Sequence, residues 1–335
     1  MKNNLIFVIT DGIQNTVFES QVIIPLLKKK ENYKICLVSY EKESKDLEQK
    51  YPEIKFVIFK TNIFLTKLSL IPSIFKLKKF LKNFDSYDLI ARGPVAGYIC
   101  QKSADKNCKN LTIQARGLLA QEYFYVRRNE NFIKKFLHFI RARSYHNLEK
   151  CVYNKKNNSF IESVTPALKD FLISNYKARP ENIDIAKYDI PEKITPEKFQ
   201  TNRIKVRQSL NIQENIEVYC YNGSAHAWQC PEQMIKFFKL KLDENPNSFL
   251  LILSQNKNYF EKLLKQYSLP QNSYKVLTLK HDIVFEYLCA ADYGIIFREK
   301  HIINWVARPT KVLEYQAAGL KILHNNTVKL LIDND

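Results

Sequence analysis

The chain has 335 residues, of which 45% are hydrophobic and 26% are charged, as in an ordinary globular protein. Its length is too great for one ordinary domain and suits two, and no stretch approaches the roughly 18 uninterrupted apolar residues of a membrane-spanning helix. The formal net charge of +18 favours anionic partners such as phosphates, nucleic acid or an anionic membrane surface, although a lysine-rich surface alone gives the same excess.

Short apolar runs alternate with helical patterns through the first half of the chain. The first run, at residues 5–10, is too short for a signal peptide and predicts a strand. Further strands are predicted at residues 34–40, 55–59, 88–91, 110–115 and 158–162. Helices are predicted at residues 17–30, 63–84, 95–106, 131–153 and 165–176. This alternation is typical of a parallel sheet covered by helices on both faces.

The next segment, residues 178–204, carries Pro180, Pro191 and Pro196 among charged residues and has no clear periodicity. It predicts a linker at 181–204 between an N-terminal domain, 1–180, and a C-terminal domain, 205–335. The alternation then restarts, with strands predicted at 217–222, 249–254, 275–279, 293–297 and 320–324 and helices at 231–242, 259–267, 283–290 and 310–318. The expected fold class is α/β, with two Rossmann-like domains facing across a ligand-binding cleft.

The most informative pattern precedes the last predicted strand. One strand ends at Arg298, a polar loop follows, and Pro309, Thr310 and Lys311 open a helix. The free N–H groups and the dipole of a helix start form an anion site, to which a lysine adds charge toward a diphosphate. Glu314 lies one turn further on, where a carboxylate can accept both hydroxyls of a ribose. The alternative is a capped amphipathic helix with Glu314 solvated or paired to Lys311.

This segment resembles the donor site of GT-B glycosyltransferases, particularly the retaining, family 4-like enzymes. The shared pattern, P-x-K-x-x-E-Y-x-A-x-G, is matched here by Pro309, Lys311, Glu314, Tyr315, Ala317 and Gly319. The resemblance implies that Glu314 binds the ribose of a nucleotide-sugar, with UDP or GDP as the expected nucleotide, and that Lys311 and the helix start receive the diphosphate. Glu314, Lys311 and Arg298 are therefore the predicted catalytic residues.

Two positions depart from the family pattern. Many members carry a second acid where this chain has Val306, so the role of the nearest upstream acid, Glu299, stays open. A proline usually follows the Gly-Leu pair, where this chain has Lys321.

A second segment, residues 221–229, follows the first strand of the C-terminal half and resembles the family's Y-x-G-S…W-Q loop over the donor phosphates. Gly223 would let backbone N–H groups approach a phosphate, and Ser224 continues that loop. His226 can donate to the same phosphate or be an ordinary loop histidine. Together with Arg298, Pro309, Thr310, Lys311 and Glu314, these three residues form the predicted donor site, which needs no further cofactor and no metal.

Candidate acceptor residues follow strands of the N-terminal half. Asp11 and Gly12 follow the first strand, and Arg92 and Arg116 end two later strands at the carboxyl edge of the sheet. An arginine there can bind an anionic acceptor, such as a lipid-linked pyrophosphate or an acidic glycan, or it can pair with a carboxylate such as Glu122. Glu122 is a further candidate, because Arg116-Gly117 with Glu122 resembles the D-x-R-G…E segment of some relatives, with Gln114 in place of the acid.

Two further observations concern location. Basic and aromatic residues are mixed at 124–145 and 63–84, which suits an anionic membrane surface as well as an ordinary amphipathic helix. The seven cysteines are scattered without a Cys-x-x-Cys pair, which is typical of reduced thiols in the cytoplasm. We therefore expect a cytoplasmic protein that can lie on the inner membrane face.

These patterns predict a glycosyltransferase that moves a sugar from a nucleotide-sugar to a glycan or lipid-linked acceptor in bacterial surface polysaccharide synthesis. A nucleotide-sugar 2-epimerase of the same fold is the nearest alternative. A catalytically silent relative is another, because of Val306. A basic nucleic-acid binder is a third, but the chain carries no recognised motif for nucleic acid, and none is expected as a partner.

Overall fold

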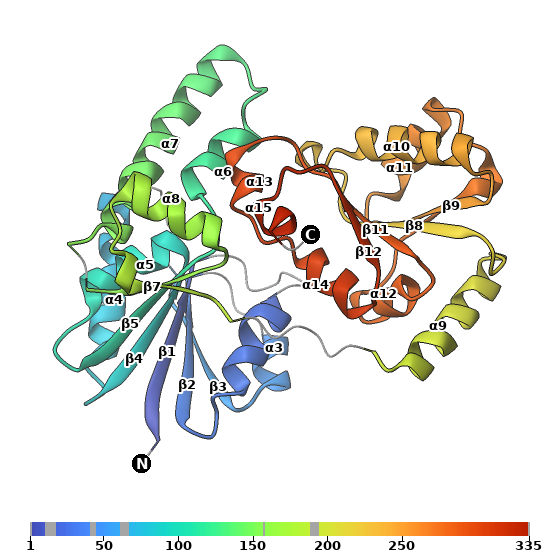
Figure 1. The fold of residues 1–335 in the computed structure, drawn as a ribbon. Coiled ribbons are helices and arrows are strands. Elements are labelled where there is room, and N and C mark those ends of the chain that lie inside the picture. The colour runs from blue at the N-terminus through green and yellow to red at the C-terminus, as the bar shows by residue number, and fades with distance from the viewer. Residues whose placement is uncertain are drawn as a thin grey trace. The chain divides into compact units, whose positions relative to one another are not determined.

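The computed structural model describes residues 2–10, 18–40, 45–60, 67–156, 158–187 and 194–333. The chain divides into two compact units, Met1–Ala186 (unit 1) and Lys187–Asp335 (unit 2). Each unit is an α/β structure built on its own parallel sheet, as the alternation of elements predicts (Figure 1). Among the described residues, no helix combines the length and the apolar character needed to cross a membrane.

The sheet of unit 1 has seven strands in the order β3-β2-β1-β4-β5-β6-β7, all pairing in parallel. The strands are β1 (Asn3–Ile9), β2 (Tyr33–Ser39), β3 (Ile54–Ile58), β4 (Tyr87–Arg92), β5 (Cys108–Ala115), β6 (Phe160–Ser163) and β7 (Ile183–Ile185). The last five residues of β1 and of β2 are all buried, because helices cover both faces of the sheet. Their apolar side chains make up much of the core of this unit.

Helices connect these strands. They are η1 (Glu19–Ile23), α2 (Ile24–Leu27), α3 (Lys45–Lys50), η2 (Lys67–Leu70), α4 (Ile71–Leu81), α5 (Gly93–Ser103), α6 (Leu119–Val126), α7 (Phe132–Tyr153), α8 (Pro166–Tyr176) and η3 (Pro180–Asn182). Side chains cap the start of two of these helices. The Asn131 side chain accepts a hydrogen bond from the Lys134 N–H at the start of α7, and the Thr165 side chain accepts one from the Leu168 N–H at the start of α8. Helix α5 packs against both α4 and α7.

The sheet of unit 2 has five parallel strands in the order β10-β9-β8-β11-β12. They are β8 (Glu217–Asn222), β9 (Ser248–Leu253), β10 (Tyr274–Leu277), β11 (Tyr293–Ile296) and β12 (Lys321–His324). The helices are α9 (Pro196–Ser209), η4 (Ala227–Gln229), α10 (Pro231–Glu244), α11 (Lys257–Gln266), η5 (Gln271–Ser273), α12 (His281–Leu288), α13 (Ile302–Trp305), α14 (Thr310–Ala317) and α15 (Lys329–Ile332). Two apolar clusters form the core of this unit.

The segment expected to be an irregular linker contains two regular elements. Strand β7 pairs with β6 and so extends the sheet of unit 1. Helix α9 begins at Pro196, where the Thr195 side chain accepts from the Lys198 N–H. A proline fits the first helical position without loss of a hydrogen bond, so Pro196 starts a helix within the segment that the sequence predicts to be a linker.

Candidate functional site

The strand order of unit 2 creates a ligand-binding edge. Connections run in opposite directions from β8, because β9 lies on one side of it and β11 on the other. In parallel sheets, ligands bind at the carboxyl ends of the strands where the order reverses in this way. Asn222 is the last residue of β8, and Arg298 follows the end of β11 by two residues. The predicted donor residues of these two segments therefore lie at this edge.

Helix α14 contributes the carboxylate of the site. The Asn222 Nδ2 donates to Glu314 Oε2 over 2.7 Å, and the Asn222 backbone N–H donates to the Tyr315 hydroxyl over 2.9 Å. Tyr315 is fully buried, and a Cβ at Gly294 in β11 would overlap its ring. Because Gly294 leaves room for this ring, α14 packs closely on the sheet and presents Glu314 to the end of β8.

Two cations, Lys311 and Arg298, lie close to Glu314 or to each other and form a charged cluster with it. Burial lowers the pKa of the Lys311 amine, the Glu314 carboxylate opposes that shift, and the positive charge of Arg298 adds to it. Burial also lowers the pKa of the Arg298 guanidinium. Neither cationic side chain forms a hydrogen bond or an ion pair with a residue that the structure describes, and Glu314 forms no ion pair with Lys311 there. Two half-buried cations that form no ion pair among the described residues make a site suited to an anion.

The backbone around Arg298 is held on both sides. Its N–H donates to Asn325 Oδ1 over 3.1 Å, and its carbonyl accepts from Asn325 Nδ2 over 2.8 Å. The next residue, Glu299, donates its N–H to the Trp228 carbonyl, which ties this loop to residues 223–229. The position of the arginine is therefore set by main-chain contacts, and its side chain is not needed for them.

The loop of residues 223–229 packs tightly after β8. The Gly223 N–H donates to the Leu253 carbonyl, and a Cβ on Gly223 would lie 2.6 Å from Gln229 Oε1. Gln229 Nε2 donates to Ser224 Oγ over 2.8 Å. The ring of His226 stacks on that of Trp228, with centroids 4.2 Å apart. The Ser224 hydroxyl already has a partner, and the phosphate contacts of Gly223, Ser224 and His226 stay predictions.

Helix α14 starts at Thr310, where the predicted helix 310–318 also starts. Pro309 has an extended backbone and lies just before the helix, one position ahead of the first helical residue. Helix boundaries defined in different ways differ by this much. The Val312 N–H donates to the Pro309 carbonyl over 3.1 Å, whereas the backbone N–H groups of Thr310 and Lys311 have no partner within the helix, so the helix start keeps two donors for an anion.

In unit 1, two predicted acceptor residues converge on one side chain. Arg92 ends β4, Arg116 follows β5, and one guanidinium nitrogen of each donates to Gln21 Oε1, over 2.8 Å and 2.6 Å. Glu122 in α6 lies against Gly117, beside Arg116 in the sequence. Asp11 and Gly12 lie outside the described residues.

Solved structures of several proteins are similar to this chain. HepE from Anabaena, in complex with UDP and glucose, is 15% identical, with a TM-score of 0.66 over 98% of this chain and 82% of that one. WaaG, a glycosyltransferase involved in lipopolysaccharide biosynthesis, is also 15% identical, with a TM-score of 0.64 over 98% and 84%. A putative UDP-N-acetylglucosamine 2-epimerase from Listeria monocytogenes is 12% identical, with a TM-score of 0.54 over 99% and 82%.

The chain has the GT-B fold. Identities this low establish the fold and leave the activity to be argued from the site. No family model matches the sequence, and no curated protein matches it. The expected fold class is confirmed, since both Rossmann-like units of a GT-B protein are present.

Sequence reasoning missed three polar residues that organise these GT-B units. Asn222 positions Glu314, and Gln21 joins the two arginines. Glu149 in α7 is fully buried and accepts from the Leu119 N–H over 2.7 Å and from the Tyr176 hydroxyl over 2.9 Å. Burial raises the pKa of the Glu149 carboxyl to about 7. Asn222, directly before Gly223 at a strand end, carried a usable signal. The other two make contacts to residues far apart in the sequence.

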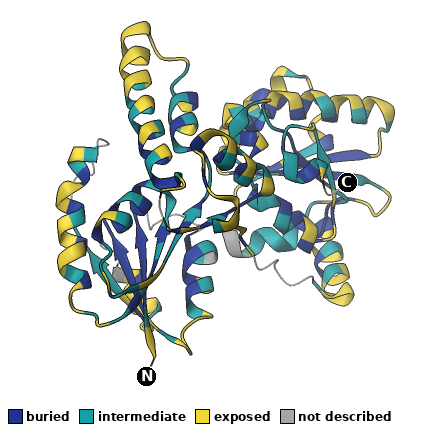
Figure 2. Cartoon of the chain, turned by 60° about the vertical axis from the view of Figure 1, so that its left-hand side comes forward, coloured by how far each residue is buried: buried dark blue, intermediate teal, exposed yellow. Residues whose placement is uncertain are grey.

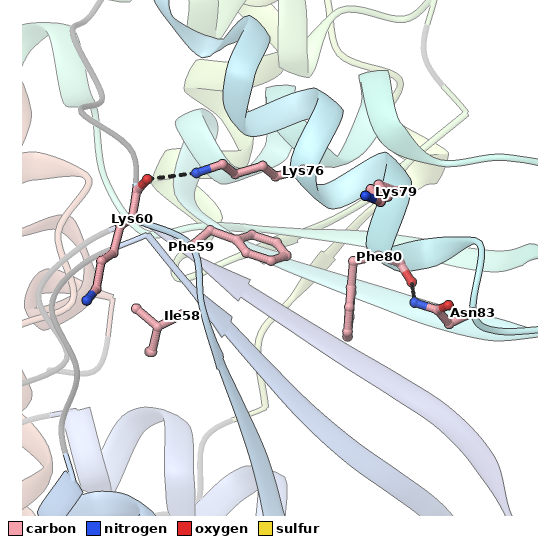
Figure 3. A pocket seen from close by; sticks show the side chains of 7 residues that line it. All are labelled: Ile58, Phe59, Lys60, Lys76, Lys79, Phe80 and Asn83. Atoms are coloured by element: carbon pink, nitrogen blue, oxygen red, sulfur yellow. Dashed lines mark hydrogen bonds between the residues drawn. The ribbon is translucent and has the colours of Figure 1, made fainter.

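A separate pocket of about 450 Å³ lies in unit 1 beside the end of β3 and helix α4 (Figure 3). The rings of Phe59 and Phe80 meet edge to face there, with centroids 6.0 Å apart. Lys76 Nζ donates to the Lys60 carbonyl over 2.8 Å at its rim. None of the predicted donor or acceptor residues lines this pocket, and the charged cluster of unit 2 is the better candidate because its groups are chemically suited to a nucleotide.

Proposed function

We propose that this chain is a glycosyltransferase that moves a sugar from a nucleotide-sugar donor to an acceptor. The observation that carries the proposal is the pair of half-buried cations, Lys311 and Arg298, beside an oriented carboxylate, Glu314. An anionic diphosphate would compensate both cations, and a carboxylate one helical turn away is placed for a ribose.

The donor would occupy unit 2. Lys311, Arg298 and the start of α14 would hold the diphosphate. The loop after Gly223 would approach it through other backbone N–H groups, because the Gly223 N–H donates to the Leu253 carbonyl. Glu314 Oε2 already accepts from Asn222, and Oε1 has no hydrogen-bond partner among the described residues, so Oε1 can accept from a ribose hydroxyl. HepE binds UDP and glucose and, in a second complex, UDP-glucose, which supports a UDP-sugar as the first donor to test.

Transfer needs stabilisation of the leaving nucleotide diphosphate, whose negative charge grows as the glycosidic bond breaks. Lys311 and Arg298 would supply that stabilisation as fixed positive charges, so we propose that transfer is independent of a divalent metal. We also propose that the anomeric configuration is retained, on the resemblance of residues 309–319 to retaining enzymes.

The acceptor would bind in unit 1. Arg92 and Arg116 share Gln21 Oε1, and an acidic glycan or a lipid-linked pyrophosphate would suit two neighbouring guanidinium groups. Glu122, Asp11 and Gly12 complete the proposed acceptor site. Because WaaG acts in lipopolysaccharide biosynthesis, a surface polysaccharide is the acceptor class proposed here, and the reaction would face the cytoplasm.

The first experiment is a thermal-shift screen of the purified chain with UDP-, GDP-, CMP- and dTDP-sugars, followed by calorimetry with the best donor. Lys311→Met should weaken its binding by about 10- to 100-fold, the loss expected for one charged hydrogen bond. Lys300→Met is the matched control, since Lys300 is exposed close to Arg298 in the sequence and should keep wild-type affinity. Equal affinity in wild type and Lys311→Met would contradict the donor site.

The same material separates transfer from epimerisation. Incubation with the donor alone should return the donor unchanged, and EDTA should leave transfer unaffected once an acceptor is found. Appearance of an epimeric nucleotide-sugar without any acceptor would overturn the transferase proposal in favour of an epimerase, the activity in the printed name of one similar structure.

A further inference from the structure

The first half of α7 exposes large apolar side chains to solvent. Phe132 and Ile133 are 86% and 75% exposed, and four more follow within two turns: Phe136, Leu137, Phe139 and Ile140. This end of the helix extends beyond the sheet and its other helices, and it is coloured as exposed in Figure 2. A contiguous exposed apolar patch of this kind marks an interaction surface.

The exposed side chains share one face of the helix. Phe132, Ile133, Phe136, Leu137 and Ile140 follow the spacing of a single helical stripe. The opposite face is the one that packs on the protein: Tyr123 of α6 contacts His138 and Tyr145, and its hydroxyl lies 2.7 Å from His138 Nδ1. In this first half of α7, the aromatic and polar side faces the protein and the most apolar side faces outward.

Two basic residues of α7 lie next to this stripe: Lys135 is beside it, and Arg143 follows Phe139 by one helical turn. Arg127 and Arg141 instead lie over the Tyr123 ring on the packed face. The nearest acid in the sequence, Glu130, is paired with Lys134 over 3.8 Å. An apolar stripe bordered by cations matches a surface that is apolar inside and anionic at its boundary.

Helix α4 repeats the arrangement. Ile71 and Phe75 of α4 and Leu68 of the preceding η2 are exposed, and four lysines follow them, at positions 76, 78, 79 and 82. Helix α5 packs against both α4 and α7, so the two exposed surfaces belong to one layer of unit 1. The same pattern on two neighbouring elements supports a shared interaction surface more strongly than a single apolar cluster would.

We propose that unit 1 binds an anionic lipid bilayer. The apolar side chains of residues 132–140 would insert among the lipid headgroups, and the neighbouring lysines and arginines would bind the negatively charged headgroups. A second copy of this chain is a poorer occupant, because it would bring the same excess of positive charge to the interface. The proposal extends the proposed function toward a lipid-linked acceptor, but membrane binding itself requires neither donor nor acceptor.

The test is sedimentation of the full chain with vesicles of equal parts phosphatidylglycerol and phosphatidylcholine, and with pure phosphatidylcholine. Wild type should pellet with the anionic vesicles. The triple variant Phe132→Ser, Ile133→Ser and Leu137→Ser should bind them at least about tenfold more weakly, because these exposed side chains contribute to insertion and not to the core. Lys135→Gln with Arg143→Gln should weaken binding to the anionic vesicles and reduce the dependence of that binding on salt, because two of the attracting charges are lost.

Matched controls change exposed residues of unit 2. Ile204→Ser, Leu240→Ser and Tyr259→Ser remove three exposed apolar side chains, and Lys262→Gln with Lys265→Gln removes two exposed charges. Both should bind like wild type. The proposal would be overturned if the Phe132 triple variant bound vesicles as well as wild type does. It would also be overturned if wild type formed a dimer that the variant does not form and neither protein bound vesicles. Thermal shift with the donor on the same variants distinguishes this failure from failure of the donor site.

Discussion

The side-chain amide of Asn222 donates to the Glu314 carboxylate across 2.7 Å and joins the end of β8 to helix α14. The backbone N–H of the same asparagine donates to the Tyr315 hydroxyl, so one strand end holds two successive residues of the helix. Glu314 is therefore fixed through Oε2, with Oε1 left for a ligand. Orientation of this carboxylate before the donor arrives lowers the entropy lost on binding.

Asn222→Ala should weaken binding of the preferred nucleotide-sugar by about tenfold, because an unheld Glu314 must be ordered by the ligand. Asn222→Ala combined with Glu314→Ala should bind no more weakly than Glu314→Ala alone, since the asparagine acts through the glutamate. Calorimetry of the four proteins measures this coupling. Asn245→Ala is the control, because Asn245 also donates to a glutamate, Glu217, but at the opposite edge of the sheet. If the losses in binding free energy of Asn222→Ala and Glu314→Ala added up in the double variant, Asn222 would not act by positioning Glu314.

Lys311→Met should raise the melting temperature of the ligand-free protein by a few °C, at the same time as it weakens nucleotide binding. Burial lowers the pKa of this amine from 10.5, so the folded chain holds the proton less tightly than the unfolded chain. The stability cost is therefore present while the amine is charged, and it disappears as the pH rises from the lowered pKa toward 10.5. Calorimetric melting at pH 7 and pH 10 should show the gain shrinking, whereas Lys300→Met should show no gain at either pH.

Glu149 gives unit 1 a pH dependence in the opposite direction. Burial raises the pKa of its carboxyl from 4.5 to about 7, so the folded chain binds this proton more tightly than the unfolded chain. The stability it contributes is fully present below pH 4.5 and is lost as the pH rises through about 7. Urea denaturation should show that wild type loses stability relative to Glu149→Gln between pH 5 and pH 8. The exposed control Glu181→Gln should follow wild type, and parallel curves for Glu149→Gln would contradict the burial effect.

Asp292→Asn should destabilise unit 2 by about 3 kcal/mol or more, because it leaves a buried guanidinium without its carboxylate. Asp292 Oδ2 accepts from Arg207, which is 1% exposed, over 2.9 Å, and Oδ1 accepts from Arg203 over 2.8 Å. Glu286→Gln removes the exposed pair with Lys205 and should cost less than about 1 kcal/mol. Denaturant titration of both variants measures the contrast, and equal losses would show that burial does not set the cost.

The strands were largely predictable because buried parallel strands are continuous apolar runs, and β1, β2 and β9 are such runs. Strand β7 was missed because three residues are too few to show a period. Helix α6 was missed because its start depends on Glu149, a residue about thirty positions later that accepts from the Leu119 N–H. Contacts at that separation have no signature in a local pattern.

The candidate site divides in the same way. Lys311 and Glu314 were predictable because a helix start and one helical turn place them by local geometry. Asn222 and Arg298 meet them only because β8 and β11 are neighbours in the sheet, although they are far apart along the chain. The pairing of Arg92 and Arg116 through Gln21 likewise depends on the adjacency of β4 and β5.

Asp292 lies at the beginning of β11, where it also accepts from the Val218 N–H near the beginning of β8. In a parallel sheet this edge is opposite to the one that carries Asn222 and Arg298. Residues that keep unit 2 folded and residues that would contact a donor thus occupy different ends of the same two strands. Mutations that alter donor preference can accumulate at one end while the arginine–aspartate cluster at the other preserves the scaffold, so descendants of this chain can change specificity without compensating repairs.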